Sequence, residues 1–240
     1  MRASLPRQPG APLPSPGTTI RAVEARGKHL LIEFGDDTWL HTHLRMHGSW
    51  HTYRHSRRWN TSSGNAVAIL ETRDVVAVCF SAPVVEVLTA RDLERHVQLS
   101  SLGPDLCATE PDLDEALHRL SRLDPPIEIG VALLDQRVAS GIGNVYKNEV
   151  LWACAVDPFA SVGSLDHATR RSLLQTASVL LRRNLDGGRR TTYRGGLAVY
   201  DRAGQPCPRC GDGVRMQPQG EQHRITWWCT TCQPATTQAL

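Results

Sequence analysis

The chain has 240 residues, a net charge of +3 and seven cysteines. This length allows one large domain or two of ordinary size, and so modest a charge does not by itself indicate a nucleic-acid partner. The sparse cysteines argue against a secreted disulfide scaffold, and neither a membrane-spanning apolar run nor a signal peptide is found, so we expect a soluble intracellular protein.

The first part of the chain predicts a leader followed by strands. Residues 1–17 hold five prolines and no apolar periodicity, which predicts an extended or disordered leader. From Thr18 onward, apolar and polar residues alternate as they do in half-buried strands. The alternating positions are Leu30, Ile32 and Phe34; Leu40, Thr42, Leu44 and Met46; Val67 and Ile69; Val76, Val78 and Phe80; Val85 and Val87. Strands at this spacing predict a β-sandwich or barrel over 18–104.

After Pro104 the pattern becomes helical, which predicts a helical domain over 105–200 and an α+β chain. Apolar residues recur at helical spacing in 112–122, 129–136 and 144–153. The longest helix is expected to begin after Ser164, as its N-cap, and to stop at Gly187.

Four cysteines near the C-terminus form two Cys-x-x-Cys pairs separated by 18 residues. The pairs are Cys207 with Cys210 and Cys229 with Cys232. Two such pairs can close a tetrahedral thiolate site around one structural Zn²⁺, with a β-hairpin between them, although two disulfides or four unrelated thiols are the alternative. We therefore predict a zinc finger over 201–240, with Arg224 presented at the hairpin tip.

A glycine-punctuated turn, Gly141-Ile142-Gly143, precedes the helix that begins at Asn144. The backbone N–H groups and the Asn144 amide at a helix start form an anion site suited to a DNA phosphate. A simple glycine turn between two core helices explains the same residues.

Residues 133–152 and the cysteine pairs resemble the helix–two-turn–helix and zinc finger of the formamidopyrimidine-DNA glycosylase/endonuclease VIII family. Within that family the chain looks most like the actinobacterial endonuclease VIII branch. Three further segments are similar to the family: 23–31 to a lysine-bearing strand, 41–50 to its void-filling loop, and 101–105 to the passage between its domains. The resemblance implies an antiparallel β-sandwich domain and a helical domain, with DNA lying in a groove between them.

The resemblance also implies an activity. A family member is a bifunctional DNA glycosylase and abasic-site lyase, which excises oxidised bases from damaged double-stranded DNA by base flipping and an imine intermediate. For this branch, oxidised pyrimidines are expected rather than purines. The chain is expected to work as a monomer, away from membranes, in the cytoplasm and on the bacterial nucleoid.

The implied roles fall on residues of both halves. Lys28 would contact phosphate or the lesion beside the scissile sugar, and it is the candidate for a substitute imine-forming amine. Met46 would enter the gap left by the flipped base, flanked by Arg45 and His47. Without the resemblance, Lys28 would be a solvated strand residue and Met46 a core residue.

The remaining implied contacts lie in the second half. Asn144 and Arg224 would hold phosphates around the flipped nucleotide. Lys147 would add a further phosphate contact, although an exposed helical lysine explains it equally well.

The family's nucleophile, an N-terminal proline followed by glutamate, is not found in this sequence, which opens Met1-Arg2-Ala3-Ser4. A late start assignment, a truncation and a non-cleaving relative each explain this opening. A sandwich without the family's first strand and helix is expected to be poorly stable. The alternative functions are a catalytically silent DNA or lesion binder and a zinc-ribbon structural protein.

Overall fold

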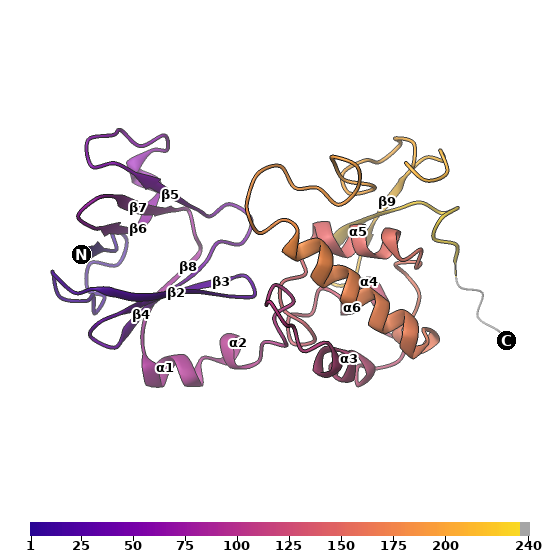
Figure 1. Cartoon of the computed structure of the whole chain (residues 1–240), viewed down its shortest axis with the longest axis horizontal. Coiled ribbons are helices and arrows are strands. Elements are labelled where there is room, and N and C mark those ends of the chain that lie inside the picture. Colours follow the sequence, from indigo (N-terminus) through magenta and orange to yellow (C-terminus); the bar gives the residue numbers. More distant parts are fainter. Residues whose placement is uncertain (236–240) are drawn as a thin grey trace. The chain divides into compact units, whose positions relative to one another are not determined.

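The computed structural model describes residues 1–235, which divide into two compact units between Ser101 and Leu102. The first unit holds two antiparallel sheets, and the second holds helices and one hairpin (Figure 1). The predicted α+β class is confirmed. Within 1–235, none of the helices has both the length and the apolar character needed to cross a bilayer.

The two sheets of the first unit have four strands each. One has the order β1-β6-β7-β5, built from β1 (Arg2–Ser4), β6 (Ala66–Glu71), β7 (Val76–Phe80) and β5 (Ser49–Tyr53). The other has the order β2-β3-β4-β8, built from β2 (Ile20–Arg26), β3 (His29–Phe34), β4 (Thr38–His43) and β8 (Val84–Thr89). A short 3₁₀ turn, η1 (Ser63–Asn65), precedes β6.

A shared apolar core lies between the sheets. Ile32, Phe34 and Leu40 reach it from one sheet, and Leu70 reaches it from the other. Because side chains alternate across a strand, this core fixes which residues of β3 and β4 point outward. Strand β4 ends at His43, so the sequence-predicted strand residues Leu44 and Met46 lie in the loop before β5.

The proline-rich leader is an ordered part of the sandwich, which agrees with the extended alternative for residues 2–4 and contradicts the disordered one. Residues 2–4 form β1, which pairs antiparallel with β6. Leu5 is only 4% exposed in the core, and the Met1 amine donates a 2.8 Å hydrogen bond to the Thr18 carbonyl. Burial of apolar residues such as Leu5 offsets the entropy of ordering this segment.

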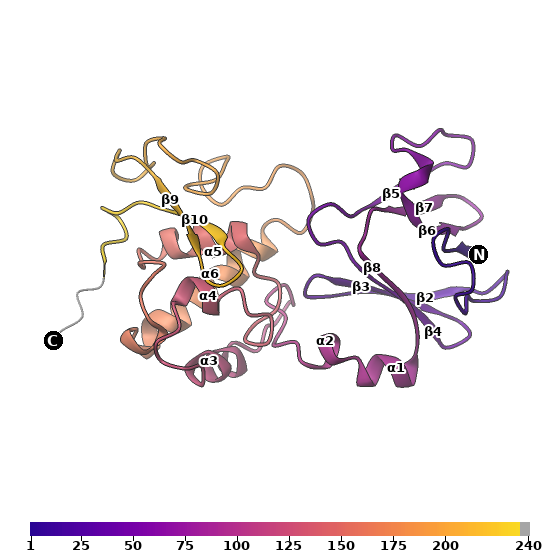
Figure 2. The same cartoon turned by 180° about the vertical axis from the view of Figure 1, so that it is seen from behind.

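Two short helices, α1 (Ala90–Arg95) and α2 (Val97–Ser100), follow β8 and were not predicted. Thr89 and Asp92 form a capping box at the start of α1, in which each side chain accepts a hydrogen bond from the other's backbone N–H. Helix α1 lies beside β4 and β8, as Figures 1 and 2 both show.

The second unit contains α3 (Leu113–Ser121), α4 (Ile129–Ala132), α5 (Asn144–Ala153), α6 (His167–Arg182), the 3₁₀ turn η2 (Val162–Ser164), and a hairpin of β9 (Arg215–Gln219) and β10 (Arg224–Trp228). Helix α4 ends earlier than predicted. Helix α6 is capped by Asp166, whose carboxylate accepts from the Thr169 N–H at 2.7 Å, and not by Ser164. It ends at Arg182, before Gly187. The positive charge of Arg182 in the last turn interacts favourably with the helix dipole.

Candidate functional site

Helix α5 begins at a turn that needs glycine. Gly141 has φ +107°, a backbone conformation that side chains rarely adopt. The Gln136 side chain holds the turn, because its oxygen accepts from the Gly141 N–H at 3.1 Å and its nitrogen donates to the Ile142 carbonyl at 2.9 Å. Asn144 is thereby fixed as the first residue of α5.

One face of α5 binds the hairpin and the cysteine group along its whole length. Four α5 residues at helical spacing each make at least one hydrogen bond to this C-terminal region. The bonds join Asn144 to the Ile225 carbonyl at 2.8 Å, Lys147 to the Thr226 hydroxyl at 2.6 Å, the Trp227 N–H to Asn148 at 2.8 Å, and the Trp152 indole to the Cys207 sulfur at 3.4 Å. The helix therefore aligns the predicted anion site and the predicted finger as one structure.

Asn144 and Arg224 come together at the open end of this face. The Asn144 amide bonds the carbonyl of Ile225, the residue that directly follows Arg224. Arg224 is exposed and begins β10, immediately after the hairpin turn, where its Nε donates to Gln222 at 3.4 Å. The junction places a helix N-terminus and an amide next to the strand position of a basic residue, a combination that suits an anion.

Lys147 occupies a different position from the one expected. Its side chain is fully buried, so it is neither an exposed helical lysine nor a phosphate contact, and we correct that prediction. Burial and the nearby Arg224 charge lower the pKa of Lys147 to about 8, with Glu128 acting in the opposite direction. The ammonium supports the hairpin beneath Arg224.

Glu149 anchors the loop that leads from α6 to the cysteines, and sequence reasoning missed it. This carboxylate is 1% exposed and accepts backbone hydrogen bonds from Ala198, Val199 and Tyr200 at 2.7 to 2.9 Å. The Thr192 hydroxyl donates to the same carboxylate. A buried carboxylate is stabilised by several such donors.

The four cysteines converge within 4.8 Å of one another. The Cys207 and Cys232 sulfurs lie 3.8 Å apart, and those of Cys210 and Cys229 lie 3.4 Å apart. Four sulfurs bound tetrahedrally to one Zn²⁺ would lie about 3.8 Å apart. The separation and the donor type therefore fit a structural Zn²⁺ site.

The electrostatics of the cysteine group favour a bound cation. Burial and the neighbouring cysteine sulfurs raise the pKa of Cys232 to about 12. Burial also acts to raise the pKa of Cys207, but hydrogen bonds, including one from the Trp152 indole, lower it to about 6. A divalent cation would relieve the repulsion among four crowded thiolates.

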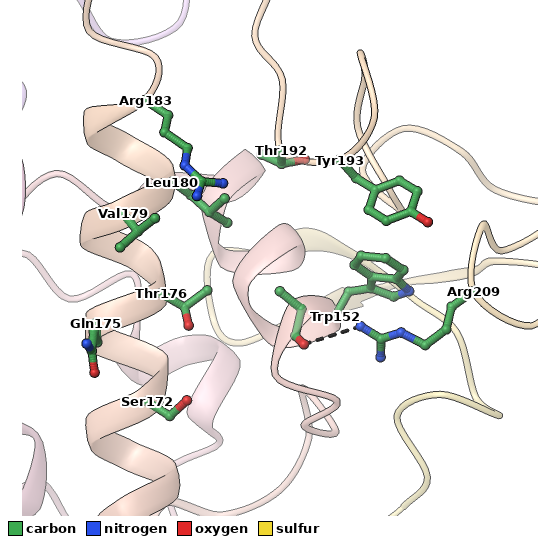
Figure 3. Close-up of a pocket in the computed structure, with 11 residues that line it drawn as sticks. Trp152, Ser172, Gln175, Thr176, Val179, Leu180, Arg183, Thr192, Tyr193 and Arg209 are labelled. Atoms are coloured by element: carbon green, nitrogen blue, oxygen red, sulfur yellow. Dashed lines mark hydrogen bonds between the residues drawn. The ribbon is translucent and has the colours of Figure 1, made fainter.

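A pocket of about 600 Å³ opens at the C-terminal end of α5 (Figure 3). Arg209 covers the Trp152 ring, with its guanidinium carbon 4.2 Å from the ring centroid, and donates to the Ala153 carbonyl at 3.2 Å. Tyr193 meets the same ring edge-on at 5.1 Å. Within the described part of the chain, no sequence-predicted site residue lines this pocket, so it stands apart from the Asn144 junction.

In the first unit, the remaining predicted residues lie at one end of the sheet with the order β2-β3-β4-β8, called the β2–β4 sheet below. Lys28 is exposed in the β2–β3 turn, and His29 pairs in register with His43, the last residue of β4. The loop after His43 exposes Arg45, Met46 and His47. This register brings Lys28 beside the loop.

The charges of Lys28 and Arg45 at this end of the sheet both act on His43. Burial lowers the pKa of His43, and the charges of Arg45 and Lys28 lower it further. Met46 is 73% exposed, which is unusual for a large apolar side chain. The end of the sheet therefore combines positive charge with one exposed apolar side chain.

Gly48 makes the 44–48 loop tight. A Cβ at this position would lie 2.6 Å from the Leu44 carbonyl oxygen and 3.0 Å from the Ala82 Cα. Only glycine fits there without moving backbone.

The N-terminal amine lies at the opposite end of the first unit from the β2–β3 turn, as both views show (Figures 1 and 2). The sequence contains only two lysines, Lys28 and Lys147. Since Lys147 is buried and the Met1 amine is bonded to Thr18, Lys28 is the exposed lysine amine beside the 44–48 loop.

Comparison with known proteins finds two matching family models. The formamidopyrimidine-DNA glycosylase N-terminal domain matches residues 9–83, and the formamidopyrimidine-DNA glycosylase H2TH domain matches residues 102–194. The first match begins inside the proline-rich leader, in keeping with its place in the sandwich.

Several of the similar curated proteins come from actinobacteria. Probable endonuclease 8 2 of Streptomyces coelicolor is 43% identical over 223 residues, covering 90% of this chain and 80% of that protein. The DNA-(apurinic or apyrimidinic site) lyase Nei2 of Mycolicibacterium smegmatis is 37% identical over 226 residues, covering 92% and 84%. Among solved structures, Lactococcus lactis Fpg bound to abasic-site DNA superimposes with a TM-score of 0.76 at 24% identity, covering 91% of this chain and 83% of that chain. At that identity the likeness concerns the fold.

Proposed function

Because the chain belongs to the formamidopyrimidine-DNA glycosylase and endonuclease 8 family, we propose that it is a base-excision repair enzyme with DNA glycosylase and abasic-site lyase activity. Its substrate is damaged double-stranded DNA, which it meets as a monomer in the bacterial cytoplasm. The names of its relatives, endonuclease 8 and abasic-site lyase, support this reaction class. The observation that carries the proposal is the junction of Asn144 with the hairpin at Arg224.

In our proposal that junction grips the DNA backbone. The first N–H groups of α5 and the Asn144 amide donate to one phosphate, and Arg224 neutralises a neighbouring charge. The buried hydrogen bond between Lys147 and Thr226 fixes the position of the hairpin along α5. Such contacts position the duplex without reading its sequence.

A structural Zn²⁺ held by Cys207, Cys210, Cys229 and Cys232 completes this half of the proposal. The thiolates hold the two ends of the segment that contains the β9–β10 hairpin, and the Trp152–Cys207 bond ties them to α5. The ion stabilises the fold and takes no part in the reaction.

In the first unit, Met46 is proposed to enter the space left by an extruded base. Exposure of this apolar side chain to water is unfavourable. Packing of the side chain between bases would bury it and is therefore favourable. Arg45 and His47 flank it in the same loop and can contact the backbone. Oxidised pyrimidines are the proposed lesions, by kinship with the endonuclease 8 relatives.

Lys28 is proposed as the amine that reacts with an abasic site. Its nitrogen adds to C1′ of the ring-opened sugar, and loss of water leaves an imine. The imine allows removal of a C2′ proton and expulsion of the 3′ phosphate. Hydrolysis then returns the free amine and releases the cleaved strand. The support is its exposure beside the 44–48 loop, while Lys147 is buried.

Borohydride trapping on duplex oligonucleotides that contain an abasic site or thymine glycol tests the proposal. We expect strand cleavage, a covalent adduct that maps to the Lys28 peptide, and loss of the adduct in Lys28→Ala but not in Lys147→Met. An adduct on the Met1 peptide, or one unchanged in Lys28→Ala, would reject Lys28 as the amine. Tight lesion binding with neither cleavage nor adduct would instead identify a silent lesion binder.

A further inference from the structure

A second cluster of metal-ligating side chains lies on the outer face of the β2–β4 sheet, away from the four cysteines. It contains His41 of β4, Glu86 of β8 and His96 at the junction of α1 and α2. One ligand atom from each of the three lies within 4.8 Å of the others. We propose that His41, Glu86 and His96 form a binding site for a divalent transition-metal ion, with Zn²⁺ as the reference ion.

The backbone fixes all three ligands. His41 and Glu86 are paired residues in the β4–β8 register, so their side chains project from the same face. His96 is the N-cap of α2, and α1 packs beside β4 and β8. The His41 Nδ1 and His96 Nε2 atoms lie 2.8 and 3.1 Å from the same Glu86 oxygen. Two imidazoles and one carboxylate form a ligand set that proteins use for zinc.

The second nitrogen of each imidazole is already occupied. His41 Nε2 lies 2.8 Å from His29 Nδ1, and His96 Nδ1 accepts from the Leu99 N–H at 3.3 Å. These outer bonds leave His41 Nδ1 and His96 Nε2 directed at the shared point beside Glu86. The contact of His41 with His29 is of the kind that orients metal-binding histidines. The Leu99 N–H must release His96 Nδ1 when the ion binds, because a neutral imidazole that binds metal through Nε2 carries its proton on Nδ1.

The site is sheltered on one side and open on the other. His41 is fully buried and the His96 side chain is 16% exposed, whereas the Glu86 side chain is 44% exposed. The ion therefore has a route from solvent and room for a water as a fourth ligand. Its binding would pin the α1–α2 segment, which leads into the second unit, onto the sheet.

Metal stoichiometry tests the site, because the cysteine group and this site should each hold one ion. After incubation with Zn²⁺ and gel filtration, we expect two zinc ions per wild-type chain by elemental mass spectrometry. His96→Gln and Glu86→Gln should retain one. His51→Gln, which removes an exposed histidine of the same unit, should retain two.

Cobalt and melting measurements separate the two sites. Co²⁺ added to protein whose cysteine group already holds zinc should give d–d bands without thiolate charge-transfer absorption, and Zn²⁺ should raise the Tm of wild type but not of His96→Gln. The Tm of each variant without added metal shows whether it folds. One ion per wild-type chain, or a second ion that survives both substitutions, would overturn the site and leave a hydrogen-bonded histidine network.

Discussion

The Lys147 ammonium donates a 2.6 Å hydrogen bond to the Thr226 hydroxyl and so joins α5 to β10 inside the second unit. Thr226 in turn donates to Gln219 on the facing strand β9 at 2.7 Å. A charged lysine with no exposed surface is destabilising. Burial of Lys147 therefore makes the stability of the unit depend on pH.

We expect Lys147→Met to remove that pH dependence. Below about pH 8 the folded chain carries the buried charge, and the full penalty is present. Between about pH 8 and pH 10.5 the folded chain binds fewer protons than the unfolded chain, so the unfolding free energy rises with pH. The wild-type value should gain about 3 kcal/mol relative to Lys147→Met over this interval.

Urea unfolding across that pH interval measures the difference. Lys28→Met is the matched control, since it removes the other lysine from an exposed turn and should follow wild type. A pH-independent offset between Lys147→Met and wild type would contradict the buried, titrating ammonium.

Substitutions at the α5–hairpin junction should weaken DNA binding. Asn144→Ala and Arg224→Ala are each expected to cost about 1–3 kcal/mol in binding free energy. Arg224→Ala removes a charge, so the slope of log affinity against log salt should also become shallower by about 1. Fluorescence anisotropy with a lesion-containing duplex at several salt concentrations measures both quantities. Arg122→Ala, at the exposed end of α3, is the control, and equal losses in all three variants would argue against a local phosphate grip.

The backbone of the loop that carries Met46 should change conformation when Gly48 gains a side chain. In Gly48→Ala the new Cβ meets the Leu44 carbonyl at 2.6 Å, so the backbone must shift at a cost of about 1–3 kcal/mol. We expect a lower Tm and a loss of lesion binding. Gly10→Ala meets no heavy atom within 4 Å and should behave as wild type. Unchanged lesion binding by a folded Gly48→Ala protein would separate the loop from DNA recognition.

The ordered N-terminal segment should contribute to stability. Leu5→Ala removes a side chain that is 4% exposed in the sandwich core and is expected to lower the unfolding free energy by about 2–5 kcal/mol. Arg7→Ala, which alters an exposed side chain bonded to the Gly64 carbonyl, should cost far less. If both substitutions lowered the unfolding free energy by the same small amount in urea, the leader would be disordered rather than packed in the core.

Local pattern predicted those elements whose own residues show a clear periodicity or spacing. The bounds of α5 agree with the predicted 144–153, the strand positions from Leu30 to Val87 are largely correct, and the cysteine spacing correctly predicted one convergent group. The resemblance to the glycosylase family is confirmed by the matching family models and relatives.

Long-range contacts decided what local pattern could not predict. The leader has no periodicity of its own, and it becomes a strand because β6, more than 60 residues away, supplies the pairing. Lys147 and Glu149 look like surface residues of an amphipathic helix, yet α5 is buried from Tyr146 to Trp152. The only local signal was that apolar residues occur on every side of this helix, which indicates burial all round.

Strand β1 has a single neighbour in its sheet and only three residues. Five prolines follow it within the next twelve positions, and proline has no amide hydrogen to offer a neighbouring backbone. Three residues are a short template for intermolecular sheet extension, and the prolines that follow cannot lengthen it by donating backbone hydrogen bonds.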